Sequence, residues 1–184
     1  VARVEVPEHV VVLTELARRI GLKTNHVEYC RLEDGQQTHD YLVIERYDRL
    51  ITETGVQRLH QEDFCQALGV GRERKYEAEG GVDFASVYRV LQEISADPAP
   101  DVMQLLRWQI FNYVAGNSDG HAKNLSLLYH AGRAIRLAPF YDLVCTRAID
   151  SIDTSLAFSV GGERVPGNIH ARHWQQMATG LRIR

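Results

Sequence analysis

The apolar positions in the first quarter of the chain predict one helix followed by a β-hairpin. Residues 8–20 carry apolar side chains at helical spacing, and Gly21 supplies a stop. Two β-rich runs follow at 26–32 and 40–47. The turn-forming Glu33-Asp34-Gly35 lies between them, so we expect the two runs to pair as an antiparallel hairpin.

Helical patterns dominate the middle of the chain. Residues 61–68 are expected to form a short helix, and the charged, glycine-containing stretch 71–81 a loop. Longer helices with one apolar face each are predicted at 83–95 and 102–114. Between them, Pro98-Ala99-Pro100 is expected to break the chain and reverse its direction.

A second hairpin is predicted after these helices, with strands at 125–129 and 134–137 around the turn 131–133. No internal repeat, low-complexity tract or long linker divides the chain. Helices and antiparallel strands in separate runs indicate the α+β class.

Composition narrows the possible functions. The chain has 184 residues, 45% of them hydrophobic, which is enough to bury a core. A net charge of -3 provides no basic stripe for nucleic acid, so we expect no direct nucleic-acid binding, although a DNA-bound partner stays open. Three scattered cysteines suit a reducing cytoplasm. No apolar stretch approaches the ~20 residues of a membrane span. A chain that begins without Met is expected to be a fragment.

The segment 116–124 (GNSDGHAKN) contains the densest set of reactive side chains. Its last six residues include an acid, an imidazole, an ammonium group and an amide, placed soon after an apolar helix. Loops at helix ends commonly present functional groups. A solvated turn would also have this composition, and the segment alone leaves both readings open.

The predicted second hairpin changes that balance because antiparallel strands return their ends to one place. Asn124 should therefore lie beside Asp142, with Asp119 close to both. The amide oxygen and the carboxylate suit Mg²⁺, which takes few protein oxygens together with substrate phosphates. Asp119 is placed to accept a proton from an incoming hydroxyl. This is the phosphoryl-transfer arrangement of protein kinases.

Three further assignments stay open on the residues alone. His121 could donate to the γ-phosphate or serve as a structural histidine. Its place after Asp119 resembles the loop of lipid-kinase-like enzymes. Lys123 could neutralise phosphate charge or be an ordinary solvated lysine. Residues 42–49 run from an apolar strand into charges, as a kinase hinge or a salt-bridged edge strand would.

Five ordered blocks resemble the C-terminal region of the HipA family of Ser/Thr protein kinases. The resemblance extends from about residue 8 to residue 173. The blocks are Ile44-Glu45-Arg46-Tyr47-Asp48-Arg49, residues 59–69, Lys75-Tyr76-Glu77, residues 116–124 and Pro139-Phe140-Tyr141-Asp142.

The resemblance implies a kinase-like, two-lobed fold, with a hinge at about 40–49 and most of a helical lobe at about 57–184. It implies transfer of the ATP γ-phosphate to a protein serine, with Mg²⁺. Characterised members are bacterial toxins that act on aminoacyl-tRNA synthetases, and a HipB-like DNA-binding antitoxin is a possible partner.

Site roles follow by the same resemblance. Asp119 resembles the catalytic base and His121 a second catalytic residue, and by a weaker resemblance Asp48 is expected to reach the ribose. Asn124 and Asp142 resemble the metal ligands. The nucleotide-binding positions are Glu45, Arg46, Tyr47, His121, Ala122, Lys123, Asn124, Tyr141 and Asp142.

The chain departs from the family in one respect. The family's ATP-binding lysine and phosphate-covering loop are expected upstream of residue 8, so the isolated fragment should bind ATP poorly and be inactive. Two alternatives remain. One is a metal-dependent phosphoesterase or nuclease using Asp119, His121 and Asp142. The other is a non-catalytic module, either a pseudokinase or a co-repressor bound by an antitoxin.

Overall fold

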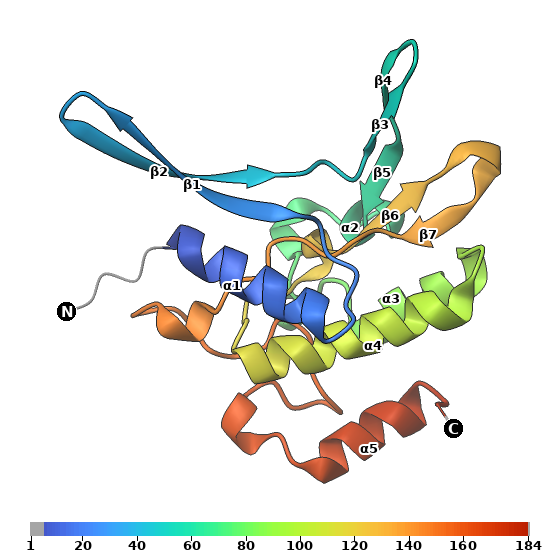
Figure 1. The fold of residues 1–184 in the computed structure, drawn as a ribbon. Helices are drawn as coiled ribbons and strands as arrows, with labels where there is room; N and C mark the ends of the chain where they lie inside the picture. The colour runs from blue at the N-terminus through green and yellow to red at the C-terminus, as the bar shows by residue number, and fades with distance from the viewer. Residues whose placement is uncertain (1–5, 184) are drawn as a thin grey trace.

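The computed structural model describes residues 6–183. Strands and hairpins lie along one side of the molecule, and the helices lie along the other (Figure 1). Helix α1 (Val6–Arg19) lies beside the hairpin of β1 (Val27–Asp34) and β2 (Gln37–Ile44), in which Val27 pairs with Ile44. The predicted first helix and hairpin are therefore confirmed.

A second, projecting hairpin was not predicted. It consists of β3 (Arg49–Thr52) and β4 (Gly55–Arg58), which pair only with each other. The predicted helix at 61–68 is wrong in its first half, because β5 (His60–Asp63) pairs with a strand far along the chain. Only α2 (Phe64–Ala67) is helical, and Asp63 and Gln66 form a capping box at its start.

Helices α3 (Phe84–Ile94) and α4 (Pro98–Ala115) pack against each other. The carboxylate of Asp83 accepts from the backbone of Ser86, which fixes the start of α3 close to its predicted position. Helix α4 begins four residues earlier than predicted. Pro98 occupies its first turn, where a missing N–H breaks no helical hydrogen bond. The chain reversal therefore falls before Pro98 and not within Pro98-Ala99-Pro100.

The core is centred on Trp108 of α4. Its indole stacks on Phe140 at 5.9 Å between centroids and meets Phe158 edge-on at 6.1 Å. These aromatic contacts join the helices to the irregular chain that follows the last strand, where the candidate site lies. The largest fully buried side chains include Trp108, Phe64, Phe140, Phe158, Leu91, Leu105, Leu125, Leu127, Leu143 and Leu156.

The predicted second hairpin is confirmed as β6 (Ser126–Tyr129) and β7 (Ile135–Leu137). With β5 it forms a three-stranded sheet in the order β5-β6-β7. Buried Asp101 of α4 anchors this sheet, because its carboxylate accepts from the Arg136 guanidinium and the Leu137 backbone. Helix α5 (Ala171–Gly180) was not predicted.

The remaining regular structure consists of single 3-10 turns. They are Arg72–Arg74, Glu77–Glu79, Ala122–Asn124, Ala131–Arg133, Thr146–Ala148 and Pro166–Asn168. The α+β class is confirmed, whereas the boundaries of hinge and helical lobe stay predictions. Among the helices in residues 6–183, none is long and apolar enough to cross a membrane.

Candidate phosphoryl-transfer site

The loop 116–124 is held by the end of α4. Gly116, at φ 70, ends the helix in a left-handed conformation that suits glycine. The side-chain amide and backbone N–H of Asn117 donate to the side-chain and backbone oxygens of buried Asn112. The carbonyl oxygen of the Asn117 side chain then accepts from the backbone of Asp119 at 3.1 Å. The backbone that carries the candidate base Asp119 is therefore held by hydrogen bonds through Asn117 to the end of α4.

Gly120 allows this loop to lie directly on α4. A Cβ at Gly120 would stand 2.5 Å from the Asn112 amide nitrogen and 3.3 Å from the Trp108 ring. Any larger residue would have to displace the Asn112 side chain or the loop itself. On the loop's other side, the Ser118 hydroxyl contacts Thr146 and donates to the Asp153 carbonyl.

The structure brings Asp119, Asn124 and Asp142 together. The Asn124 amide donates to the Asp119 carbonyl at 2.8 Å, so its amide oxygen stays available as a ligand. Burial, and then the charge of Asp119, raises the pKa of Asp142. Asp142 also has φ 58, an unusual conformation for a residue other than glycine. Such strain and such shifts gather at functional sites.

The donor set fits Mg²⁺. One carboxylate and one amide oxygen are hard ligands, and Mg²⁺ completes its shell with water and substrate phosphates. A divalent cation would also relieve the repulsion between Asp119 and Asp142. No cluster of three or more His, Cys, Asp or Glu side chains suited to a metal occurs within residues 6–183.

His121 lies beside the candidate base in a nearly closed environment. Its Nε2 is 3.5 Å from Asp119 Oδ1, and the side chain is buried. Burial lowers the pKa of His121, although the Asp119 carboxylate opposes that shift. Its Nδ1 is buried without a hydrogen-bond partner among the described residues. Buried polar atoms normally have a partner, so this nitrogen is a candidate contact for a ligand.

A cavity of about 620 Å³ adjoins Asp142. The predicted hinge residues Glu45, Arg46 and Tyr47 line it. Tyr47 and Tyr141 stack at 6.2 Å on its wall, and the backbone N–H groups of Arg46 and Tyr47 have no partner in the described part of the chain. An apolar, aromatic wall with free backbone donors suits a planar heterocycle such as adenine.

Two residues of this cavity were missed by the sequence analysis. Asn25 and Gln61 line it, and each has a buried side-chain oxygen that lacks a partner among the described residues. Both oxygens could accept hydrogen bonds from a bound nucleotide. No local pattern marked them, since Asn25 lies in a connection and Gln61 was assigned to a helix.

The other predicted nucleotide contacts lie close to the cavity without lining it. The Lys123 ammonium donates to Asp63 at 2.7 Å, and the Lys123 carbonyl accepts from the Tyr141 hydroxyl. Ala122 is buried in the core. Asp48 is buried, and its carboxylate accepts from Arg46 and Arg49.

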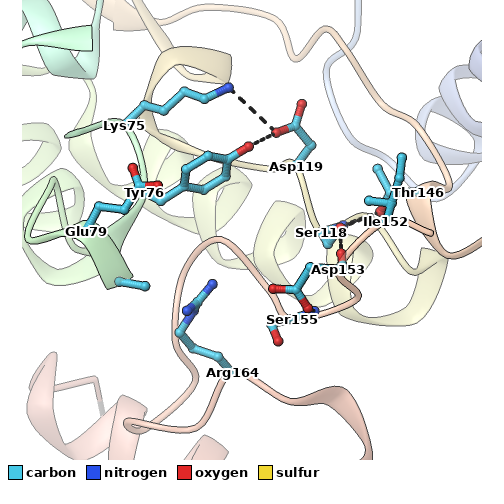
Figure 2. A pocket seen from close by; sticks show the side chains of 11 residues that line it. Lys75, Tyr76, Glu79, Ser118, Asp119, Thr146, Ile152, Asp153, Ser155 and Arg164 are labelled. Carbon is cyan, nitrogen blue, oxygen red and sulfur yellow. Dashed lines mark hydrogen bonds and ion pairs between the residues drawn. The ribbon is translucent and has the colours of Figure 1, made fainter. Parts of the chain in front are cut away.

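A second cavity, of about 570 Å³, is lined by Ser118 and Asp119 of the loop 116–124 (Figure 2). Lys75, Tyr76 and Asp119 stand at one end of it, and Arg164 lies at the other. Asp142 lines the first cavity and Asp119 the second, so the Asp119–Asn124–Asp142 cluster borders both cavities. A phosphate donor and a hydroxyl acceptor could approach this cluster from different sides.

Comparison with known proteins identifies the family. The family profile described as HipA-like C-terminal domain matches residues 3–184, and the chain belongs to this family. The putative kinase Y4mE of Sinorhizobium fredii (strain NBRC 101917 / NGR234) is 42% identical over 172 residues. The match covers 93% of this chain and 40% of that relative.

Two further similarities agree with this assignment. The serine/threonine-protein kinase toxin HipA of Shewanella oneidensis is 28% identical over 179 residues, which cover 90% of this chain and 40% of the toxin. A solved complex of HipA, HipB and operator DNA from Shewanella oneidensis MR-1 matches with TM-score 0.87 and 26% identity. That match covers 99% of this chain and 44% of the solved chain. The chain thus spans about 40% of the length of these two curated relatives.

Proposed function

We propose that the protein containing this chain is an ATP- and Mg²⁺-dependent serine/threonine protein kinase of the HipA type. The observation that carries the proposal is the cluster of Asp119, Asn124 and Asp142, which borders two cavities. The names of the relatives, kinase and kinase toxin, support the same chemistry.

Each residue of the cluster has a role in this reaction. Asp119 accepts the proton of the acceptor hydroxyl, and Asn124 and Asp142 hold the metal ion. Bound Mg²⁺ neutralises phosphate charge during transfer. His121, whose Nδ1 lacks a partner among the described residues, donates to the γ-phosphate when it carries a proton there.

The first cavity receives the nucleotide. Its hinge residues present backbone groups to adenine, and Tyr47 and Tyr141 supply the aromatic wall. Ala122, Lys123 and Asn124 follow Asp119 closely along the chain, and we assign their backbone to the phosphate side of the nucleotide. Lys123 reaches a phosphate only if its ammonium leaves Asp63.

Membership of the HipA-like family supports a proposal for the acceptor and the partner. We propose a protein serine as acceptor, with an aminoacyl-tRNA synthetase as the first substrate to test. A HipB-like DNA-binding antitoxin is the proposed partner, because the similar solved HipA chain was captured with HipB and operator DNA.

The test uses single substitutions in the full-length protein. Asp119→Asn and Asp142→Asn should each abolish transfer of labelled γ-phosphate to protein, since one removes the base and the other a metal ligand. Asp34→Asn, at the exposed tip of the β1–β2 hairpin, is the matched control and should transfer normally. Undiminished transfer by either site variant would overturn the assignment.

A further inference from the structure

Tyr76 makes the closest contact to the proposed base. Its hydroxyl donates to Asp119 Oδ1 at 2.5 Å, and the Lys75 ammonium lies 3.9 Å from the same oxygen. Figure 2 shows both side chains directed at this single oxygen, while the other carboxylate oxygen points away from them. Oδ2 of Asp119 has no hydrogen-bond partner in the described part of the chain. The two oxygens of the base are therefore not equivalent.

The backbone around Tyr76 is tightly closed. The N–H groups of Glu79 and Gly81 both donate to the Tyr76 carbonyl at 3.1 Å. A Cβ at Gly81 would stand 2.0 Å from the Arg74 carbonyl, so only glycine fits at this closure. The next residue, Glu77, anchors the turn to a distant segment, because its carboxylate accepts from the backbone and hydroxyl of Ser159.

The phenol ring is also held from two sides. It meets His121 edge-on at 5.1 Å, and the Lys75 ammonium lies over its face at 4.8 Å. Burial, and then the Asp119 carboxylate, raises the pKa of Tyr76. The phenol therefore keeps its proton and acts as a donor at physiological pH. A rigid donor aimed at one oxygen fixes the rotation of a carboxylate.

We propose that Tyr76 is a positioning residue for Asp119, holding Oδ1 so that Oδ2 receives the proton of the acceptor. The inference rests on the kinase function proposed above. In the reaction, the acceptor oxygen forms a bond to the γ-phosphorus while the bond from that phosphorus to the β–γ bridging oxygen breaks. ADP leaves, the acceptor proton moves to Asp119 Oδ2, and Tyr76 keeps its own proton.

The opposite role for Tyr76 makes a different prediction. If the phenol merely occupied the place of the acceptor hydroxyl, its removal would free the base and tighten acceptor binding. Positioning, in contrast, affects the rate of transfer and leaves binding of both substrates unchanged, since misplacement of a catalytic group by about 1 Å can lower rates about 100-fold.

The experiment measures steady-state transfer by the full-length protein with Tyr76→Phe. We expect kcat to fall about 10- to 100-fold, with KM for ATP and for the acceptor each within about twofold of wild type. Tyr129→Phe is the matched control, because the Tyr129 hydroxyl donates to the Glu62 carboxylate at 2.7 Å away from both cavities. It should leave kcat unchanged. An unchanged or increased kcat in Tyr76→Phe, or a change confined to acceptor KM, would overturn the proposal.

A second measurement separates this inference from the kinase proposal. The carboxyl ¹³C resonance of Asp119 should shift in Tyr76→Phe and not in Tyr129→Phe. If wild-type protein transfers no phosphate, the proposed function fails, and the resonance alone decides whether Tyr76 orients this carboxylate. If transfer occurs and the resonance does not move, positioning by Tyr76 is wrong.

Discussion

Asp142 is destabilising in the folded chain for two separate reasons. It adopts φ 58, where a side chain with a Cβ is strained. Its carboxylate is also partly desolvated and lies near the negative charge of Asp119, and the desolvation and that charge both raise its pKa. Neither feature helps the chain to fold. A residue kept in so unfavourable a place suits the binding of a cation, which supports its proposed role as a metal ligand.

Asp142→Asn should therefore stabilise the protein in the absence of Mg²⁺, by about 1 kcal/mol at pH 7, while transfer is lost. Asparagine tolerates the left-handed conformation and carries no charge. A carboxyl with a raised pKa holds its proton more firmly in the folded state, so its penalty is present at neutral pH. The penalty fades as pH falls through the raised pKa of the folded state and is gone below the ordinary aspartate pKa of about 3.9, where the group is protonated in both states.

Urea unfolding of both proteins at pH 7 and pH 4 measures this difference. The stabilisation should be largest at pH 7 and shrink at pH 4. Equal stability of the two proteins at both pH values would show that the Asp142 charge is already compensated in the folded chain.

At the scale of helices and strands, the elements predicted correctly were those that a local sequence pattern marks. Helix α3 was predicted closely because Asp83 caps it and one apolar face follows. The strand β5 was mistaken for a helix because its pairing with β6 joins residues more than 60 positions apart. The exposed strands β3 and β4 have no buried face whose alternation could reveal them.

The residues of the candidate site also divide into those that a local sequence pattern marks and those that it does not. Asp119, Asn124 and Asp142 were found because one hairpin joins them, and that hairpin has a local turn signal. Tyr76 lies in a separate loop, and nothing in its own sequence shows which residue it contacts. It was nevertheless part of the Lys75-Tyr76-Glu77 block on which the family resemblance rests, and this was the available signal.

Gly120→Ala tests whether close packing on α4 fixes the position of the loop 116–124. The added methyl would lie 2.5 Å from the Asn112 amide, so either the loop moves away from α4 or the Asn112 side chain that accepts from Asn117 is displaced. We expect kcat to fall at least tenfold and the free energy of unfolding to fall by about 1–3 kcal/mol. Gly167→Ala is the control, because that position has open space and an ordinary φ. Steady-state kinetics and thermal unfolding report both effects, and wild-type kcat in Gly120→Ala would contradict the expectation.

At the scale of the whole molecule, the chain offers more contacts to the adenine side of the proposed nucleotide site than to its phosphate side. The proposed adenine side has an aromatic wall and backbone donors without partners among the described residues. The phosphate side has few cations. Arg46 is the single Lys or Arg among the described residues lining the nucleotide cavity, and its guanidinium is bonded to Asp48. The two relatives are more than twice as long as the matched region, so their remaining length can contribute phosphate contacts.

This imbalance predicts different affinities for two ligands. The 184-residue chain should bind Mg²⁺·ATP at least tenfold more weakly than a protein of the relatives' length. One charge-assisted contact to phosphate contributes about 1.5–3 kcal/mol, and about 1.4 kcal/mol is a factor of ten in affinity. Adenosine is the matched control ligand, because it uses only the adenine side and should bind both proteins within about threefold. Isothermal titration calorimetry of the two proteins with both ligands measures these differences. Equal affinity of the two for Mg²⁺·ATP would mean that His121, Asn124 and Asp142 hold the phosphates with the metal alone. Weaker binding of both ligands by the shorter chain would instead place part of the adenine site outside these residues.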